Sequence, residues 1–332
     1  MPINVLVSGA GGDVGQGVIK SLHSSRLDVE VYAICISTTS AWLHKVEHSF
    51  IAPLSASDQY IPYLIELINK CKIDVFIPTV DSEILKISHF KEAIEKQTNC
   101  LVFVGHSDVV QTTDDKLKTV EFLKQNGFCS PASIALDPLT VEPFINEVGF
   151  PLILKKRSGR GGTNVFKIHS FAEIVPYYCQ VDFMLQEWLD PSHGEYTSGI
   201  YLGDDGAVKG SCTFRRQLKN GSTYIAERVV EPLLEEPLEQ IACSLGLKYL
   251  NIQSMRRGDR LIPFEFNGRL SGTTAMVSKI FNAPEMFIRE RFLGETIQRQ
   301  QNYSRFVAMR FYDEVYATDE DIKALIARSK KI

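Results

Sequence analysis

Short apolar runs alternate with segments of helical periodicity along the first third of the chain. Four apolar runs have the length and composition of buried parallel strands: residues 5–7, 31–34, 75–77 and 101–104. Between the second and third runs, apolar residues recur at helical spacing, at Ile61, Leu64, Ile65 and Ile68. This order predicts a doubly wound, Rossmann-like α/β domain with a parallel sheet over residues 1–111.

The pattern of apolar positions changes from about residue 112. Helices are predicted from residue 114 to near Gly127, over 141–148, near 171–178 and before Gly246. Strands are predicted over residues 151–155, 183–189, 194–202, 249–253 and 264–271. Strands of this kind with helices on one side predict an α+β region that is distinct from the first domain.

The composition is that of an ordinary globular protein. The chain has 332 residues, 44% of them hydrophobic and 23% charged, so it is long enough for two or three domains. The net charge of -4 argues against nucleic acid as a partner. Seven cysteines stand singly, and no apolar run reaches the roughly 18 residues of a membrane helix. Met1 leads directly into a strand pattern, without the basic segment of a secretory signal. We therefore expect a cytoplasmic protein with reduced thiols and no membrane partner.

A glycine-rich turn follows the first predicted strand, at residues 9–17. Gly9 and Gly11 could open a dinucleotide fingerprint, but Val14 holds the place of its third glycine and Gly15 comes one residue later. No acidic residue clearly ends the second strand, where a ribose hydroxyl would bind. A structural turn or a small-anion site fits better, and a Rossmann NAD-dependent oxidoreductase is the less favoured alternative.

Acidic residues follow the third predicted strand, at Asp81 and Glu83. Open α/β sheets bind ligands at this carboxyl edge, so both residues are candidates for a substrate cleft. They also suit the first turn of a helix, where negative charge is favourable. Both interpretations stay open on the sequence alone.

The stretch at residues 264–271 has a polar side chain at every second position. In an extended strand, Glu265, Asn267 and Arg269 would share one face. Two oxygen donors beside a guanidinium suit a phosphate bridged by magnesium. The alternative is an amphipathic strand whose apolar residues face a core, namely Phe264, Phe266 and Leu270.

A second glycine-rich segment follows the strand that ends at Lys155. Residues 156–165 combine basic side chains with glycines, and such a loop can fold over a polyphosphate. Its spacing is not that of a P-loop. If this loop binds phosphate, it does so in another way.

These motifs together resemble the ATP-grasp superfamily, and within it one synthetase half of the carbamoyl-phosphate synthase large subunit. The best matching segments are residues 149–155, 251–253 and 265–271, with Ser278 and Lys279 downstream. The resemblance implies a pre-ATP-grasp domain at residues 1–111, followed by a two-lobed α+β ATP-grasp domain. Its small lobe would cover residues 112–187 and its large lobe residues 188–300.

The resemblance also implies a role for individual residues. The residues that contact the ATP phosphates, together with the loop that closes over the phosphates, would be Lys116, Lys155, Ser158, Gly159, Gly161 and Gly162. Those at the adenine would be Glu187 and the backbone of Trp188 and Leu189, and Glu195 would bind the ribose. The ligands of Mg²⁺, with Mn²⁺ as a substitute, would be Gln253, Glu265 and Asn267. Arg269, with Lys155, would act on the transferring phosphoryl group.

The sequence departs from the synthase at residues 214–223, where the His-Ser-Gly-Asp-Ser signature is missing. The chain also has one synthetase half and no glutaminase-like domain, so we do not expect carbamoyl-phosphate synthesis by this chain alone. The expected activity is an ATP-dependent carboxylate–amine ligase that acts on small molecules through an acyl phosphate. Arg215 or Arg216 is a candidate for the acceptor carboxylate, and we place Arg215 among the catalytic candidates, with a solvated basic loop as the alternative.

Two questions remain open on the sequence alone. An ATP-binding sensor without ligase turnover is the main alternative function, because nucleotide contacts and catalytic contacts overlap. Residues 301–332 carry a charged helical pattern over 319–331, which suits a packing or dimer element, so a homodimer is a further expectation.

Overall fold

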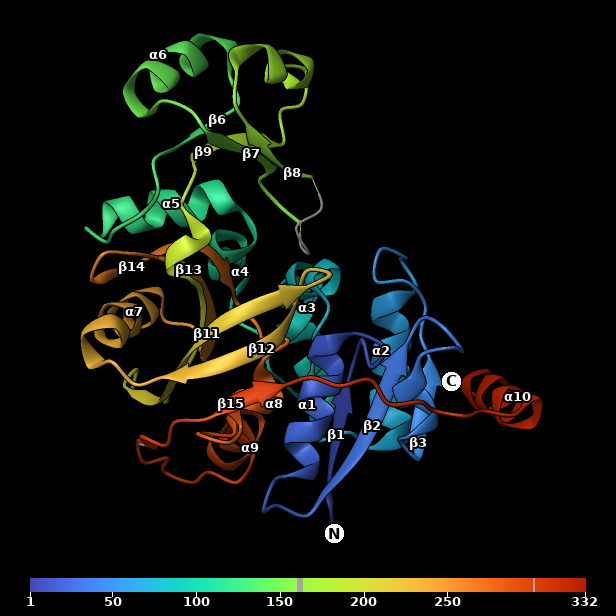
Figure 1. Ribbon diagram of the computed structural model, residues 1–332. Coiled ribbons are helices and arrows are strands. Elements are labelled where there is room, and N and C mark those ends of the chain that lie inside the picture. Colours follow the sequence, from blue (N-terminus) through green and yellow to red (C-terminus); the bar gives the residue numbers. More distant parts are fainter. Residues whose placement is uncertain (160–163, 301) are drawn as a thin grey trace.

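The computed structural model describes residues 1–159, 164–300 and 302–332. Its strands form one parallel and two antiparallel sheets (Figure 1). The expected parallel sheet is therefore confirmed, and the strands of the expected α+β region form the two antiparallel sheets.

The parallel sheet lies in the first third of the chain. Its strands are β1 (Ile3–Val7), β2 (Val29–Cys35), β3 (His48–Ile51), β4 (Val75–Ile77) and β5 (Leu101–Val102). Their order is β3-β2-β1-β4-β5, so the strand order reverses between β1 and β4. The sequence pattern missed β3, because this edge strand has only four residues and two of them are polar.

Alternate residues of β1 supply two different cores. Val5 and Val7 pack with α1 (Asp13–His23), whereas Leu6 packs with α2 (Tyr60–Cys71) and α3 (Asp81–Thr98) on the other face. Because all five strands are parallel, their carboxyl ends lie at one edge of the sheet. That edge carries the glycine-rich turn and the start of α3.

A small antiparallel sheet forms from residues 133–187. Its strands, in the order β6-β9-β7-β8, are β6 (Ser133–Ala135), β9 (Phe183–Glu187), β7 (Leu152–Lys156) and β8 (Val165–Ile168). One helix, α6 (Pro138–Val148), completes its separate core. The helix expected near residues 171–178 is instead two short 3₁₀ turns, η2 (Phe171–Glu173) and η3 (Val175–Tyr177), because Pro176 has no N–H to continue a helix.

The larger antiparallel sheet has six strands in the order β14-β13-β10-β11-β12-β15. They are β10 (Glu195–Leu202), β11 (Val208–Lys219), β12 (Ser222–Val229), β13 (Tyr249–Arg257), β14 (Arg260–Asn267) and β15 (Val307–Met309). One face of this sheet packs against α5 (Lys116–Gln125), which follows α4 (Ser107–Asp114), and α7 (Pro232–Leu245). The long hairpin of β11 and β12 turns at Asn220 and Gly221, both at positive φ.

A single core joins the α1 face of the parallel sheet to the other face of the larger sheet. Tyr201 and Phe214 from the larger sheet belong to the same buried cluster as Val5 and Val18. Short helices complete this junction: α8 (Thr274–Val277), α9 (Ala283–Phe287) and η5 (Ile288–Phe292). Two further turns are η1 (Ala41–His44) and η4 (Pro191–His193).

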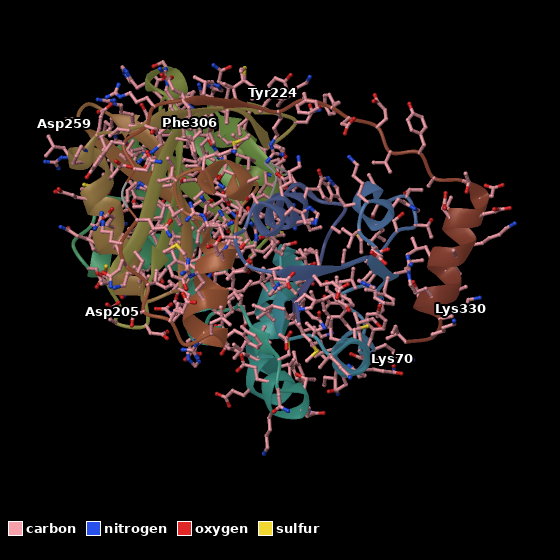
Figure 2. All side chains as sticks on the ribbon, turned by 90° about the horizontal axis from the view of Figure 1, so that it is seen from below. Lys70, Asp205, Tyr224, Asp259, Phe306 and Lys330 are labelled. Carbon is pink, nitrogen blue, oxygen red and sulfur yellow. The ribbon has the colours of Figure 1, made fainter. Side chains whose placement is uncertain are left out.

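The C-terminal segment returns to the beginning of the chain. After β15 it crosses α1, β1 and β2 and ends in α10 (Asp319–Ser329) beside β3 (Figure 1). The hydroxyl of Ser329 accepts a hydrogen bond from the backbone of Ile51 at 2.8 Å, and Arg328 Nε donates to the carbonyl of Ser49 at 2.9 Å. Figure 2 shows Lys330 on the same side of the molecule as Lys70, whose Nζ donates to the backbone of Lys331.

Candidate active site

A cleft of about 330 Å³ lies between the small sheet and the larger sheet. Ten of the residues that the sequence assigned to ATP and its metal line it: Lys116, Lys155, Ser158, Gly159, Glu187, Trp188, Leu189, Glu195, Gln253 and Glu265. Gly161 and Gly162 lie outside the described residues. Residues far apart in the sequence thus meet in one cavity, whose volume suits a small ligand.

Lys155, near the end of β7, is a buried cation in this cleft. It is 4% exposed, and its Nζ donates to Oε1 of Gln186 at 2.9 Å. Gln186 in turn donates to the hydroxyl of Ser133 at 3.0 Å, so a hydrogen-bonded row fixes the lysine. Burial lowers the pKa of Lys155 to about 8, although the nearby Glu265 carboxylate acts in the opposite direction.

Lys116 supplies a second buried cation from the start of α5. Its Nζ donates to the carbonyl of Gly159 at 2.8 Å, and the residue is 6% exposed. The preceding Asp115 caps the helix and forms two hydrogen bonds with Arg157, at 3.2 and 2.5 Å. The pKa of Asp115 is lowered: burial, the largest single effect, raises it, but the hydrogen bond and charge of Arg157 together with the backbone N–H groups of Leu117 and Lys118 outweigh burial. This pair attaches the beginning of the glycine-rich loop to α5.

The predicted metal ligands lie on two paired strands. Gln253 of β13 stands opposite Glu265 of β14, and Asn267 follows two positions later on the same strand. The next residues that pair across the two strands are Ser254 and Pro263. Phe264 is therefore the extra residue of a β-bulge in β14. Phe264 consequently faces the cleft, where Lys155 Nζ lies 5.7 Å from its ring. The alternative interpretation of the sequence, an amphipathic strand, expects this phenylalanine in a core.

The side chains of this strand fit a magnesium ion in chemical terms. All three predicted ligands offer oxygen donors, which Mg²⁺ prefers, and Glu265 lines both the cleft and the adjoining hollow. Gln253 Oε1 accepts a hydrogen bond from Arg216 at 2.7 Å, and a carbonyl oxygen has a second lone pair. Across the described residues, no group of three or more His, Cys, Asp or Glu side chains offers another metal site.

Arg216, and not Arg215, lies in the cleft. Its guanidinium forms an ion pair with Glu195 and donates to Gln253, with only 9% of its side chain exposed. Glu195 and Arg216 are directly paired across β10 and β11, so the two side chains share a face. Arg215 is exposed and faces a groove beside Gly194 and Glu227, so the structure does not bring this candidate to the cleft.

The segment predicted to bind adenine connects the two sheets. Glu187 forms an ion pair with Arg257 at 2.5 Å and accepts a hydrogen bond from the backbone of Ala132 at 3.1 Å. Its neighbour Trp188 lies under Lys167 Nζ, 3.6 Å from the ring centre. The Glu187 carboxylate therefore holds β9 to the end of β13 as well as lining the cleft.

Asn267 and Arg269 line a smaller hollow that adjoins the cleft. The hollow and the cleft share Lys116, Gly159 and Glu265. The strand β14 ends at Asn267, so Arg269 does not continue the alternation that the sequence predicted. It reaches the hollow from the turn after the strand, where it pairs with Asp81 of the N-terminal domain.

Two known proteins with similar sequences are carbamoyl-phosphate synthases. No family model matches the chain. It is 27% identical over 146 residues to a carbamoyl-phosphate synthase of Methanobrevibacter smithii, a match that covers 40% of each protein. It is 23% identical over 324 residues to the carbamoyl phosphate synthase large chain of Clostridium botulinum, which covers 88% of this chain but 29% of that relative. The chain therefore spans less than half the length of these relatives.

Among solved structures, the biotin carboxylase domain of Hydrogenobacter thermophilus 2-oxoglutarate carboxylase superimposes with a TM-score of 0.69. The sequences are 17% identical, and the match covers 90% of this chain and 71% of the other. The chain has the ATP-grasp fold. It also resembles carbamoyl-phosphate synthase, as its motifs predicted. The described part of this ATP-grasp chain has no helix that is long and apolar enough to span a membrane.

Two residues that the sequence analysis missed bind side chains of this cleft: Gln186 binds Lys155, and Arg257 binds Glu187. Gln186 and Glu187 are the two polar residues that end the otherwise apolar strand β9, so the sequence carried a local signal for Gln186 as a polar group in a buried strand. Arg257 carried no such signal, because its partner Glu187 is 70 residues away.

The lowered pKa of Lys155 predicts a pH dependence. Below about pH 8 the buried ammonium is charged in both the folded and the unfolded state, and its burial destabilises the fold. Between about pH 8 and its usual value of 10.5 the unfolded state binds the extra proton, so this contribution to the free energy of unfolding rises with pH. A bound polyphosphate would restore the charged form. Titration calorimetry above pH 8 in two buffers of different ionisation enthalpy should therefore show proton uptake when ATP binds.

Proposed function

We propose that the chain is an ATP-dependent ligase that phosphorylates a carboxylate and joins the acyl phosphate to an amine or another nucleophile. The products would be ADP, inorganic phosphate and the compound formed when the acyl group is joined to the nucleophile. The arrangement of two buried lysines opposite Glu265 carries this proposal, since both cations and a carboxylate converge on one cleft. An anionic polyphosphate with a divalent cation offsets both charges.

Each part of the cleft has a role in this proposal. Lys116 and Lys155 bind phosphate oxygens and reduce the repulsion met by an incoming carboxylate. Gln253, Glu265 and Asn267 would hold Mg²⁺, which neutralises charge on the phosphates when it is bound. Ser158 and Gly159 begin the loop that covers the phosphates and excludes water from the acyl phosphate.

The nucleoside would bind at the other end of the cleft. Trp188 and Leu189 would contact the adenine, and Glu195 would accept hydrogen bonds from the ribose. Arg216, which is already paired with Glu195, would hold that carboxylate in place for the ribose. Arg269 would bind the transferring phosphoryl group from the hollow.

The domain assignment is part of the same proposal. Residues 1–111 would be the pre-ATP-grasp domain, 112–187 the small lobe, 188–300 the large lobe and 301–332 a C-terminal segment that packs on the first domain. The substrates would be a small carboxylic acid and a small amine. The ligase and oxidoreductase alternatives differ in the site used, because the glycine-rich turn of the first domain lies outside the ATP cleft.

The proposal is tested by measuring Mg²⁺-dependent ADP release against a panel of carboxylates and amines. Hydroxylamine in the same assay should trap an acyl phosphate as its hydroxamate when the right acid is present. Turnover that depends on one acid and is trapped by hydroxylamine supports a ligase. A protein that binds Mg-ATP and never releases ADP with any pair would be a nucleotide sensor, and one that binds NADH but not ATP would be an oxidoreductase.

A further inference from the structure

An ion pair joins the N-terminal domain to the hollow beside the ATP cleft. Arg269 Nε donates to Oδ1 of Asp81, the first residue of α3, and Arg269 Nη1 donates to the carbonyl of Leu270 at 2.8 Å. The two paired side chains are only 10% and 22% exposed. The pair is thus largely shielded from water, unlike a surface salt bridge.

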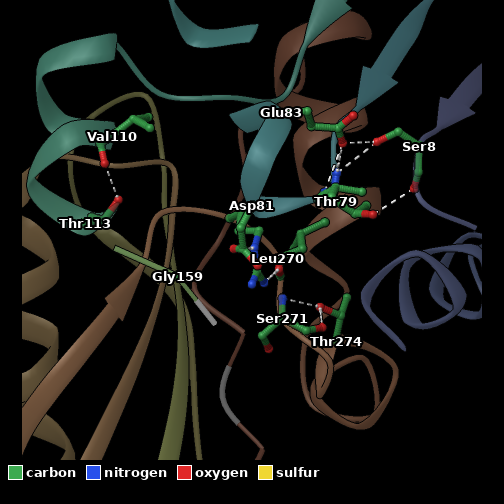
Figure 3. Close-up of polar contacts among 12 residues, drawn as sticks. Ser8, Thr79, Asp81, Glu83, Val110, Thr113, Gly159, Leu270, Ser271 and Thr274 are labelled. Atoms are coloured by element: carbon green, nitrogen blue, oxygen red, sulfur yellow. Dashed lines mark hydrogen bonds and ion pairs between the residues drawn. The ribbon is translucent and has the colours of Figure 1, made fainter. Parts of the chain in front are cut away.

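A buried carboxylate fixes the start of α3. Glu83 is 2% exposed, and it accepts hydrogen bonds from the backbone of Thr79 and Val80 and from the hydroxyls of Ser8 and Tyr60. Figure 3 shows Asp81 apart from this network, beside the segment that contains Leu270. Asp81 therefore has a fixed backbone, and the N-terminus of α3 favours its negative charge whatever Arg269 does.

The space beside Arg269 is small. The hollow has a volume of about 30 Å³, which is room for only a few water molecules. The Asp81 carboxylate already lies against Nε of Arg269. An oxyanion that binds Nε of Arg269 therefore needs the position that the Asp81 carboxylate occupies.

The donors of Arg269 lead to the same requirement. A guanidinium binds an oxyanion best through two neighbouring N–H groups. Nη1 already donates a hydrogen bond to the Leu270 carbonyl. The edge of the guanidinium formed by Nε and Nη2 is therefore the one suited to an oxyanion. Asp81 holds Nε on that edge.

We infer that Asp81 is an exchangeable counter-ion, which an oxyanion of the reaction displaces from Arg269. This inference rests on the proposed function and adds a positioning residue from the N-terminal domain to its site. The oxyanion is the acceptor carboxylate or the transferring phosphoryl group, which share the same binding chemistry. Because Asp81 competes for Arg269, the site selects an anion that binds the guanidinium at least as well as an aspartate does. Because Asp81 belongs to the N-terminal domain, binding of that anion breaks a contact between this domain and the site.

The test is a calorimetric titration of inorganic phosphate into the full chain saturated with Mg-ADP. The variant Asp81→Asn removes the competing charge and should bind phosphate about tenfold more tightly than the unaltered protein. Asp114→Asn is the matched control, because Asp114 lines the same hollow and no ion pair joins it to Arg269 among the described residues. It should change the phosphate affinity less than about threefold.

A double-variant cycle shows whether the effect passes through Arg269. Arg269→Gln should weaken phosphate binding, and adding Asp81→Asn to it should have no further effect. A parallel titration with acetate shows which oxyanion uses the site, and tighter binding of either probe by Asp81→Asn supports the inference.

Equal affinity of Asp81→Asn and the unaltered protein for both probes would overturn it, provided that both proteins bind Mg-ADP equally well. That result would leave the proposed function standing. Failure of the unaltered protein to bind Mg-ADP would overturn the proposed function, and the inference with it.

Discussion

Replacing Glu265 with glutamine is expected to weaken the binding of Mg-ATP by at least about 100-fold. Residues that merely support a metal ligand contribute about 10- to 100-fold to metal affinity, so the loss of a charged ligand should cost no less. Glutamine keeps the size of the side chain and its packing beside Phe264, and it removes the charge. Binding of ATP without magnesium should change much less. Calorimetric titrations with and without Mg²⁺ measure both effects.

Glu236→Gln is the control for this experiment. Glu236 is an exposed residue of α7, away from the cleft, so the same chemical change there should leave nucleotide binding unaltered. If Glu265→Gln bound Mg-ATP as tightly as Glu236→Gln does, the assignment of the metal site to β13 and β14 would be wrong.

The second large effect is expected at Lys155, where function and stability should change in opposite directions. Lys155→Met keeps a long side chain and removes the buried charge. The depression of the pKa from 10.5 to about 8 corresponds to a cost of about 3 kcal/mol for keeping the ammonium charged at neutral pH. The variant also loses the hydrogen bond to Gln186, which offsets about 1 to 2 kcal/mol of that gain.

The free energy of unfolding of Lys155→Met at pH 7 should therefore rise by about 1 to 2 kcal/mol, while the affinity for ATP should fall by about 100-fold. Denaturant titration and calorimetry measure the two quantities. Lys124→Met, at an exposed position of α5, should change neither by a comparable amount. Lower stability of Lys155→Met at pH 7 would show that the buried charge is better compensated than its lowered pKa indicates.

Local sequence patterns were sufficient for most elements, whereas most residues of the cleft were implied by the resemblance to the ATP-grasp superfamily. The alternation in β14 and the apolar run of β7 are properties of a few neighbouring residues, so they are visible in the sequence. The bulge at Phe264 is different, because it depends on the register between β13 and β14. A one-residue change in register moves a side chain to the other face, and no local pattern reports it.

Strand register also explains why the sequence analysis placed Arg215, and not Arg216, among the catalytic candidates. Adjacent residues of a strand point to opposite faces, so the choice requires knowing that residues 214–223 belong to two long strands and that Arg216 is opposite Glu195. The sequence of this hairpin is mostly polar and gave no strand signal. The partnership of Asp81 with Arg269 spans 188 residues and follows only from the packing of the N-terminal domain against β14.

The shared core and the small sheet have a consequence for motion. The parallel sheet and the larger sheet are joined by one buried cluster, and α10 fastens the end of the chain to β3, so these parts form a single base. The small sheet has its own core and connects to that base by the segments around residues 126–132 and 188–194. We therefore expect the small sheet, rather than the base, to move when the cleft opens and closes, with these two connections as its pivots. The ion pair of Glu187 with Arg257 lies beside one of them, at the pivot.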